Sequence, residues 1–282
     1  MVNAGKIGIV IQARMNSSRL PGKILLPLPN PGPMSLLGQI VKRASMVQNI
    51  SDIVIATSTN IENDHIEKAF ENVHVKIFRG DEDDVLKRFY EVAKLYGFSV
   101  IVRLTADNPF IEASIIEKAI DFHVKNQNDY TLTEGLPLGT NIEVFNFSAL
   151  EQSHMHADLL SEREHVTPYM RFHPEYFKLG ALEFDSKLKE MGARMTVDNE
   201  NDYAFACLVY ELLGKDDEHF NSQNVEDLIL EKAWILFINK ENVQKKVFAS
   251  SGEEIGEAIR VLSKLDLNFS VDVLKKELKK FE

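Results

Sequence analysis

The chain of 282 residues contains a single cysteine, Cys207. One thiol cannot form an internal disulfide or supply a cysteine-based zinc cluster. Because Cys207 lies in a helical pattern over residues 202–213, we expect a buried or half-buried structural thiol. Apolar runs are also short, and none approaches the roughly 20 residues that a membrane-spanning helix needs. Gln12 and Arg14 interrupt the first apolar stretch, which disfavours a signal peptide. We therefore expect a cytoplasmic protein with no membrane partner.

Acidic residues are absent from the first 51 positions, although the whole chain has a net charge of -11. Six basic residues precede Asp52, so this segment alone has a net charge of +6. Arg14, Arg19 and Lys23 lie four to five residues apart in the run QARMNSSRLPGK, directly after an apolar segment at residues 7–11. The overall acidity argues against a broad nucleic-acid-binding face. A small polyanion such as a polyphosphate, bound in one basic loop, is the favoured ligand.

Alternating strands and helices are predicted over the first 125 residues. The β-branched runs predict strands at residues 6–11, 52–56, 73–78 and 99–104. Apolar residues at three- and four-residue spacing predict helices at residues 36–44, 60–70 and 85–96. Gly97 follows the last of these helices, where a left-handed C-cap is expected. This alternation implies an α/β fold, with a parallel sheet covered by helices on both faces and ligands beyond the carboxyl ends of its strands.

The pattern becomes mixed after residue 126. Strands are predicted at residues 141–145 and 194–197, and helices at residues 157–171, 200–213 and 225–238. Trp234 is expected in the core, and residues 216–218 in a solvated turn. The C-terminal segment is typical of two amphipathic helices, the first opened by a capping box of Ser251 and Glu254. We therefore expect a main domain at residues 1–248 and a helical extension at residues 249–282.

The basic loop resembles a Walker A loop only in its Gly22-Lys23 pair. Ile24 replaces the metal-binding hydroxyl and Ser17 replaces the first glycine, so the loop is neither Walker A nor the Rossmann GxGxxG. Backbone N–H groups around Ser17 and Ser18 can instead form an anion nest, while the arginines and Lys23 neutralise charge. The alternative is a solvated basic surface loop.

Two later segments place an aspartate at the end of a predicted strand. Asp107 follows one in VRLTADNPFI and Asp198 follows another in RMTVDNENDY. Mg²⁺ is typically held by one or two carboxylates together with phosphate oxygens and water, so both are candidate metal ligands. The alternative for each is a helix N-cap. Asp202 is expected to lie at the surface or to support its neighbours, and residues 82–84 to open a helix.

Six segments, in order, carry a resemblance to a known family: IVIQARMNSSRLPGKIL, IFRGDEDDVLKRF, VRLTADNPFI, LGTNIEVF, SEREHVTPYM and MTVDNENDY. From about residue 6 to residue 248 the chain resembles the cytidylyltransferase family of CMP-sugar synthetase-like enzymes, most closely its spore coat polysaccharide biosynthesis protein F branch. The resemblance implies a three-layer, nucleotide-diphospho-sugar transferase-like fold with a mostly parallel, mixed sheet. It also implies CTP and a sugar, expected to be acidic, as substrates, Mg²⁺ as cofactor, pyrophosphate as product, and a homodimer.

The resemblance also implies roles for individual residues. Arg14, Arg19 and Lys23 would bind the triphosphate, Gln12 and Ala13 would lie near the base, and Ser17, Ser18 and Arg79 would line the nucleotide site. Asp107 and Asp198 would hold Mg²⁺ and, with Arg14 and Lys23, form the catalytic set. Glu143, Arg163 and His165 would face the sugar.

Gln12-Ala13-Arg14 stands where many sugar-activating relatives have Pro-Ala-Arg, so the sugar itself stays open. Three alternative functions also stay open: a nucleotidyltransferase for another nucleoside triphosphate, a glycosyltransferase that uses a nucleotide sugar, and a non-catalytic nucleotide-binding protein.

Overall fold

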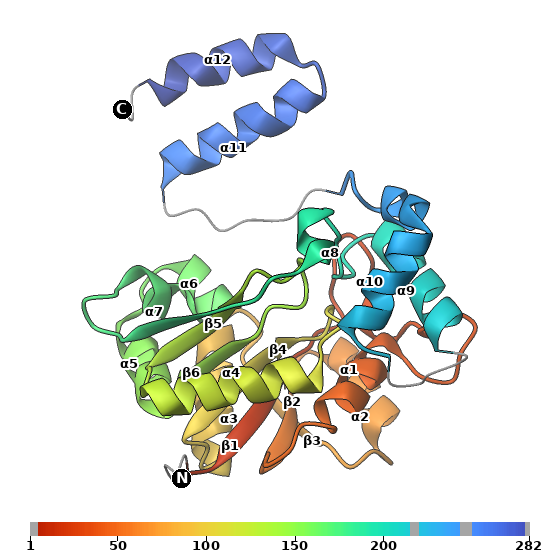
Figure 1. Cartoon of the computed structure of the whole chain (residues 1–282). Coiled ribbons are helices and arrows are strands. Elements are labelled where there is room, and N and C mark those ends of the chain that lie inside the picture. The colour runs from red at the N-terminus through yellow and green to blue at the C-terminus, as the bar shows by residue number, and fades with distance from the viewer. Residues whose placement is uncertain (1–4, 215–219, 243–249, 280–282) are drawn as a thin grey trace. The chain divides into compact units, whose positions relative to one another are not determined.

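The computed structural model describes residues 5–214, 220–242 and 250–279 (Figure 1). It divides into two compact units, Met1–Asn242 and Val243–Glu282, each of which is described by itself. The predicted domain boundary at residue 248 and the predicted turn at residues 216–218 lie outside the described residues. Within the described ranges, no helix combines the length and apolar character needed to cross a membrane.

A seven-stranded sheet forms the centre of the first unit, in the order β3-β2-β1-β4-β6-β5-β7 (Figure 1). The strands are β1 Ile7–Gln12, β2 Asp52–Ser58, β3 Lys76–Gly80, β4 Val100–Thr105, β5 Tyr130–Glu134, β6 Glu143–Asn146 and β7 Leu179–Glu183. Strand β6 pairs antiparallel with β4 and β5, while the other pairs are parallel. The predicted mostly parallel, mixed sheet is confirmed. Because β6 runs in the opposite direction, it begins at the edge where β1 and β4 end.

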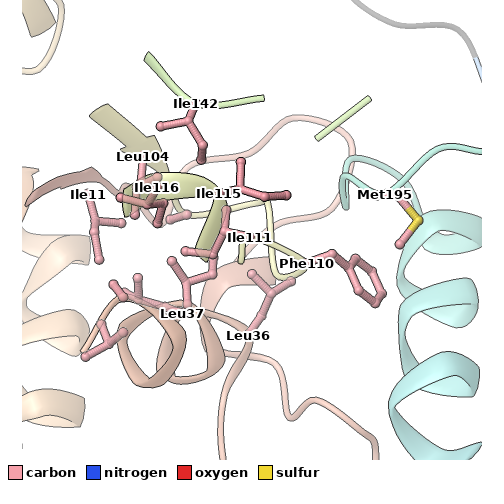
Figure 2. Packing of buried hydrophobic residues seen from close by; sticks show 14 of the residues in the cluster. Ile11, Leu36, Leu37, Leu104, Phe110, Ile111, Ile115, Ile116, Ile142 and Met195 are labelled. Atoms are coloured by element: carbon pink, nitrogen blue, oxygen red, sulfur yellow. The ribbon is translucent and has the colours of Figure 1, made fainter. Parts of the chain in front are cut away.

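Helices pack against both faces of this sheet. Ile9 and Ile11 of β1 belong to one hydrophobic cluster and Val10 to another, as expected when successive side chains point to opposite faces. The first cluster includes residues of α1 Leu36–Ala44, α2 Asp64–Phe70, α4 Ala113–Asn126, α9 Glu200–Leu213 and α10 Ser222–Glu231. The second includes residues of α3 Val85–Tyr96, α5 Phe147–His156 and α7 Pro168–Phe172. Figure 2 shows part of the first cluster, where side chains of β1, α1 and α4 interlock.

Local sequence signals set the ends of the helices near the site. Ser35 caps α1 by accepting the Gly38 N–H, and Asp84 caps α3 by accepting the Lys87 N–H. Helix α3 ends at Gly97, whose φ of 69° confirms the predicted left-handed C-cap. Asp84 therefore opens a helix as predicted, and α3 starts beside the end of β3.

Several predicted elements are wrong or incomplete. Residues 194–197 form an isolated bridge between Leu138 and Arg194 rather than a strand. The predicted helix at 157–171 is broken into α6 Leu160–His165 and α7 because Val166 adopts a φ of 71°. The helix predicted at 225–238 comprises α10 and the 3₁₀ helix η3 Ala233–Ile238, and Trp234 is 54% exposed rather than in the core. Strands β5 and β7 and helices α5 and α8 Lys187–Glu190 were not predicted.

The second unit is a helical hairpin. Helices α11 Ser251–Lys264 and α12 Asn268–Leu278 pack against each other, which confirms the two predicted helices. The predicted capping box is wrong by one residue. Ser250 is the N-cap, and its hydroxyl accepts the Glu253 N–H at 3.2 Å.

Gly135 directly after β5 yields a stability prediction. Its φ is +83°, and a Cβ there would lie 1.7 Å from the Phe184 carbonyl oxygen. Gly192 has a similar φ of +73° but no atom within 4 Å of an added Cβ. Both alanine substitutions carry a left-handed backbone cost of about 1–2 kcal/mol, and Gly135→Ala adds a backbone clash. Urea unfolding should therefore show Gly135→Ala to be the more destabilised variant. Equal losses would contradict the described packing of β5 against Phe184.

Candidate active site

Lys23 joins two segments that are far apart in the sequence. It opens the 3₁₀ helix η1 Lys23–Leu25 and is only 8% exposed. Its ammonium lies 3.1 Å from Asp107 Oδ2, 3.1 Å from Asp198 Oδ1 and 2.7 Å from the Val197 carbonyl oxygen. Lys23 therefore meets both predicted metal aspartates at the carboxyl edge of the sheet.

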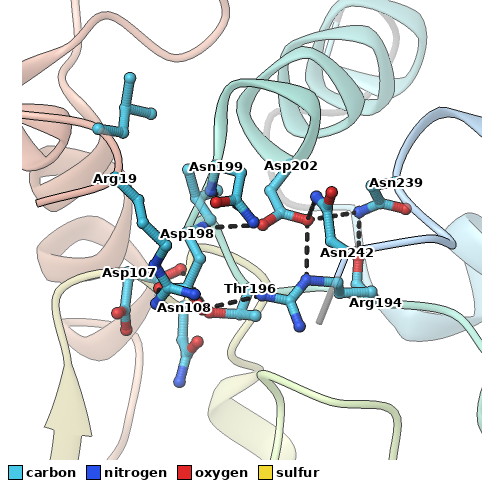
Figure 3. Close-up of polar contacts among 12 residues, drawn as sticks. Arg19, Asp107, Asn108, Arg194, Thr196, Asp198, Asn199, Asp202, Asn239 and Asn242 are labelled. Atoms are coloured by element: carbon cyan, nitrogen blue, oxygen red, sulfur yellow. Dashed lines mark hydrogen bonds and ion pairs between the residues drawn. The ribbon is translucent and has the colours of Figure 1, made fainter. Parts of the chain in front are cut away.

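Asp198 is held from both sides by arginines. Arg19 Nη2 lies 2.8 Å from Asp198 Oδ1, and Arg194 Nη2 lies 2.8 Å from Oδ2. Charge-assisted contacts of this kind fix the carboxylate more firmly than neutral hydrogen bonds do. Figure 3 shows Arg19 and Arg194 approaching Asp198 from different segments.

Asp202 lies beneath this cluster and is fully buried, which excludes the predicted surface position. Its Oδ2 accepts the backbone N–H groups of Asp198 and Asn199 at 3.0 Å. Its Oδ1 accepts Arg194 Nε at 2.9 Å and the side-chain amides of Asn239 and Asn242 (Figure 3). Burial opposes the charged form, but these donors and Arg194 outweigh it and lower the pKa of Asp202. Asp202 thus supports Asp198 in two ways. It accepts the backbone N–H of Asp198, and it holds Arg194, which contacts the Asp198 carboxylate.

Helix capping does not account for either candidate metal aspartate. Helix α4 begins at Ala113 with Glu112 as its N-cap, several residues beyond Asp107. Helix α9 is capped by Asn199, with Asp202 completing the capping box. The alternative explanation for Asp107 and Asp198 is therefore wrong.

Asp107 is held in its ionised form. Thr105 donates its hydroxyl to Asp107 Oδ1 at 2.7 Å, while Lys23 contacts the other oxygen. Burial by itself would raise the pKa of Asp107, but Lys23 and the Thr105 hydrogen bond outweigh it and lower the pKa.

The aspartate pair fits a hard cation that takes its remaining ligands from a nucleotide. Asp107 and Asp198 both face one point, the Lys23 ammonium. Among the described residues, no group of three or more His, Cys, Asp or Glu side chains could hold a metal by itself. Mg²⁺ commonly binds one or two carboxylates plus phosphate oxygens, and this donor set matches that chemistry.

The basic loop between β1 and η1 is held at several backbone positions. Ala13 donates its N–H to Ala56 at the adjacent strand, and Met15 donates to Asn63 Oδ1 at 2.8 Å. Gly22 adopts a φ of 68° and donates its N–H to the Met15 carbonyl. These bonds close the loop, so that Lys23 turns inward while Ser18 and Arg19 stay exposed.

A second polar group lies on the α3 side of the sheet. Arg103 of β4 forms an ion pair with Glu143 at the start of β6 and donates to Gln12 Oε1 at 3.3 Å. Tyr130 and Thr167 donate hydroxyls to Glu143 Oε1, each at 2.6 Å. Burial opposes the charge of Glu143, but Arg103 and these donors lower its pKa, whereas burial and Glu143 raise the pKa of Tyr130. Arg103 therefore links Gln12, which was predicted to lie near the base, to Glu143, which was predicted to face the sugar.

Helix α6 lies next to the basic loop. Arg14 Nη2 is 3.8 Å from Glu164 Oε1, and His165 is half-buried at the end of the helix. Val166 follows with φ 71° and ψ -53°, and the next N–H, from Thr167, donates back to the His165 carbonyl. This γ-turn is strained for a β-branched residue, and such strain is concentrated at functional sites. Thr167, which follows this turn, donates its hydroxyl to Glu143.

Arg79 and Arg163 have other protein partners. Arg79 binds Asp64 and Glu67 of α2 through Nη1, and backbone carbonyls through Nε and Nη2. Arg163 donates Nε to Asp84 at 2.8 Å and Nη1 to two backbone carbonyls. A ligand would have to compete with these partners, and the roles given to both arginines stay predictions.

Sequence reasoning missed the full or partial burial of three arginines, Arg88, Arg103 and Arg194, of which Arg103 and Arg194 contact residues of the site. Arg88 and Arg103 occupy positions that the apolar periodicity of α3 and β4 predicts to be buried. A charged residue at such a position is an exception to the pattern, and this exception was the available signal of their unusual burial. Arg194 lies four residues before Asp198, but no pattern indicated that it would turn toward that carboxylate.

The fold and the site together define a nucleotidyltransferase. The segment from residue 8 to residue 252 matches the model of the family described as cytidylyltransferase. A solved cytidylyltransferase from Leptospira borgpetersenii superposes with a TM-score of 0.76, at 29% identity over 86% of this chain and 99% of that one. The chain belongs to the cytidylyltransferase family.

Two relatives match this chain over most of their own length. The spore coat polysaccharide biosynthesis protein SpsF of Bacillus subtilis is 36% identical over 73% of this chain and 87% of its own. An uncharacterised protein of Methanocaldococcus jannaschii is 39% identical over 78% of this chain and 87% of its own. The resemblance noted in the sequence is therefore confirmed.

Substituting Asp202→Asn should destabilise the protein by about 3 kcal/mol, because it leaves buried Arg194 without its full charge partner. The lowered pKa of Asp202 makes its contribution fully present above the unfolded value near 4 and lost as pH falls through the folded pKa. Urea unfolding should show the gap between wild type and Asp202→Asn closing below about pH 4. Glu200→Gln, an exposed carboxylate on the same helix, is the control. A gap that does not change with pH would contradict the assigned charge of Asp202.

Proposed function

We propose that this protein transfers CMP from CTP to a sugar hydroxyl in a Mg²⁺-dependent reaction that releases pyrophosphate. The observation that carries the proposal is the meeting of Lys23, Arg19, Asp107 and Asp198 at the carboxyl edge of the sheet. The product would be a CMP-sugar for surface polysaccharide, in keeping with the relationship to SpsF. An acidic sugar is the proposed acceptor class.

The cations of the loop are proposed to bind the triphosphate. In the ligand-free protein, Lys23 and Arg19 are neutralised by Asp107 and Asp198. Arg14 is more open, with a side-chain exposure of 42% and a long ion pair to Glu164. When CTP binds, phosphate oxygens would become the partners of these cations. Charge that builds on the departing pyrophosphate would then meet donors that are already positioned.

Asp107 and Asp198 would hold the Mg²⁺ ion. When bound, the ion would neutralise phosphate charge and orient the α-phosphate for in-line attack. Thr105, Arg194 and Asp202 fix the direction of both carboxylates before the nucleotide arrives. Little covalent work falls to the protein, and the barrier is lowered by positioning and by fixed charges.

The sugar is proposed to lie between the start of β6 and the α6–α7 turn. Glu143 orders this region because it pairs with Arg103 and accepts hydrogen bonds from Tyr130 and Thr167. His165 precedes the strained Val166 and is the proposed sugar contact there, with Arg163 anchoring its helix to Asp84. We also propose a cytoplasmic location and a homodimer. The exposed apolar residues Leu159 and Leu160 support the homodimer.

Substituting Asp107→Asn should lower kcat for pyrophosphate release by at least about 100-fold, because it removes one of two charged metal ligands without changing core volume. The measurement is pyrophosphate release from CTP with Mg²⁺ and a panel of acidic and neutral sugars. Asp227→Asn, an exposed carboxylate on α10, should retain full activity. Unchanged Mg²⁺-dependent turnover in Asp107→Asn would overturn the proposed site.

Substituting Lys23→Met should raise the Kd for CTP at least about tenfold, since a charge-assisted contact contributes roughly 1.5–3 kcal/mol. Calorimetric titration of ligand-free protein with CTP and Mg²⁺ measures this directly. Lys94→Met changes an exposed lysine on α3 and should leave the Kd unchanged. Normal affinity in Lys23→Met would remove the loop from the triphosphate site.

A further inference from the structure

The helical hairpin of α11 and α12 has almost no core of its own. Val271, which is 4% exposed, is the one buried apolar residue among the hairpin's described residues. By contrast, Leu265, Phe269 and Val273 are 62%, 83% and 44% exposed. Units of fewer than about 40 residues usually need a disulfide, a metal or oligomerisation for stability. Cys207, the single cysteine of the chain, lies outside the hairpin, and no group of three or more His, Cys, Asp or Glu among the described residues could hold a metal. The hairpin therefore needs a partner surface.

Helix α11 carries more apolar surface than one neighbouring helix covers. Ile255, Ile259 and Leu262 recur at four- and three-residue spacing and form one stripe. Val261 and Leu265 form a second stripe, about 100° around the helix, because Val261 directly precedes Leu262. Helix α12 packs against α11 but can cover only one of these stripes. The exposure of Leu265 identifies the second stripe as the open one.

Helix α12 has an open apolar stripe as well. Phe269 and Val273 are four residues apart, so their side chains lie on one side of the helix. Val271 lies two residues from each of them, which corresponds to about 200° of helix rotation. Both exposed side chains therefore point away from the position that is buried within the hairpin.

Unpaired charges of opposite sign lie at the same end of the hairpin. Glu254 lies in the first turn of α11, and three lysines lie at the end of α12: Lys275, Lys276 and Lys279. All four side chains are exposed, and none forms an ion pair within the described part of the chain. Since α11 and α12 run antiparallel, the start of one lies beside the end of the other (Figure 1). The hairpin therefore carries both partners of an intermolecular ion pair.

We infer that this hairpin pairs with the hairpin of a second copy of the chain to form a four-helix bundle. A two-fold axis parallel to the helices would place α11 of one copy antiparallel to α12 of the other. Val261 and Leu265 of one copy would then pack on the open stripe of α12 in the other copy. Each contact would occur twice, because a two-fold interface uses the same surface of both copies.

Charge favours a second hairpin over an unrelated surface. In the bundle, Glu254 of one copy lies opposite Lys276 of the other, and the pair is repeated by the two-fold axis. Residues 250–279 contain six acidic and five basic residues, a net charge of -1, whereas the whole chain has a net charge of -11. Two hairpins can therefore meet without strong electrostatic repulsion. Exposed ion pairs add little stability, so apolar burial holds the bundle together and the charges set its orientation.

This contact differs from the dimer contact proposed at Leu159 and Leu160. Nearly all of the hairpin lies beyond residue 252, where the match to the cytidylyltransferase family ends. The inference therefore goes beyond the proposed function and does not depend on it. Hairpin pairing would tether two catalytic units through segments outside the active site.

Cysteine cross-linking in the full-length protein tests the pairing and its orientation. In a Cys207→Ser background, one chain carries Glu254→Cys and a co-expressed chain with a different tag carries Lys276→Cys, so that every disulfide joins two chains. Oxidation should give the mixed dimer in excess over either dimer of identical chains. The control pairs Glu254→Cys with Lys264→Cys, which lies at the opposite end of α11. More cross-linking in the control pair, or equal yields in all pairs, overturns the inference.

Insertion of a charge provides an independent test. Phe269→Glu places a carboxylate in the proposed interface and should lower the yield of the mixed dimer at least about tenfold, because the charge would be buried without a partner. Ser263→Glu places a carboxylate on the exposed side of α11, away from Val261 and Leu265, and should leave the yield unchanged. A wild-type yield in Phe269→Glu overturns the inference. Sedimentation of the full-length protein as a monomer also overturns it, since the hairpin would then be covered within one chain or by another protein.

Discussion

The ammonium of Lys23, held between the carboxylates of Asp107 and Asp198, is the interaction on which the site depends. It ties the basic loop after β1 to the segment after β4 and to the start of α9. The support continues inward, because buried Asp202 holds Arg194 and Arg194 holds Asp198. A chain of alternating charges thus connects an exposed loop to the interior, and each member is stabilised by the next.

This arrangement explains how a site for a polyanion remains stable before its ligand arrives. Lys23 and Arg19 are neutralised by the two carboxylates, so their positive charge does not stay uncompensated. In the proposed reaction, the cations would gain phosphate partners and the carboxylates would hold the metal ion. Opposite charges would then be exchanged in pairs. Arg88 shows the contrasting case, because its buried guanidinium has no acceptor among the described residues.

Elements that depend on local interactions were predicted well from the sequence, whereas those that depend on residues far apart in the chain were not. Periodicity located β1, β2, β4 and α9, because these depend on local alternation and burial. The strand-end rule and the family resemblance predicted that Lys23, Asp107 and Asp198 belong to one site, but not the ion pairs that join them. Strands β5 and β7 were missed, and residues 194–197 were misassigned, since edge pairing depends on distant partners. The contacts of Arg194 depend on its side-chain direction, which no spacing specifies.

The most direct test of the account is a crystal structure with a non-hydrolysable CTP analogue and Mn²⁺ in place of Mg²⁺, located by its anomalous signal. The account predicts one metal between Asp107 and Asp198, with Lys23 moved from both carboxylates onto the phosphates. A nucleotide bound elsewhere, with Lys23 still between the two aspartates, would contradict it.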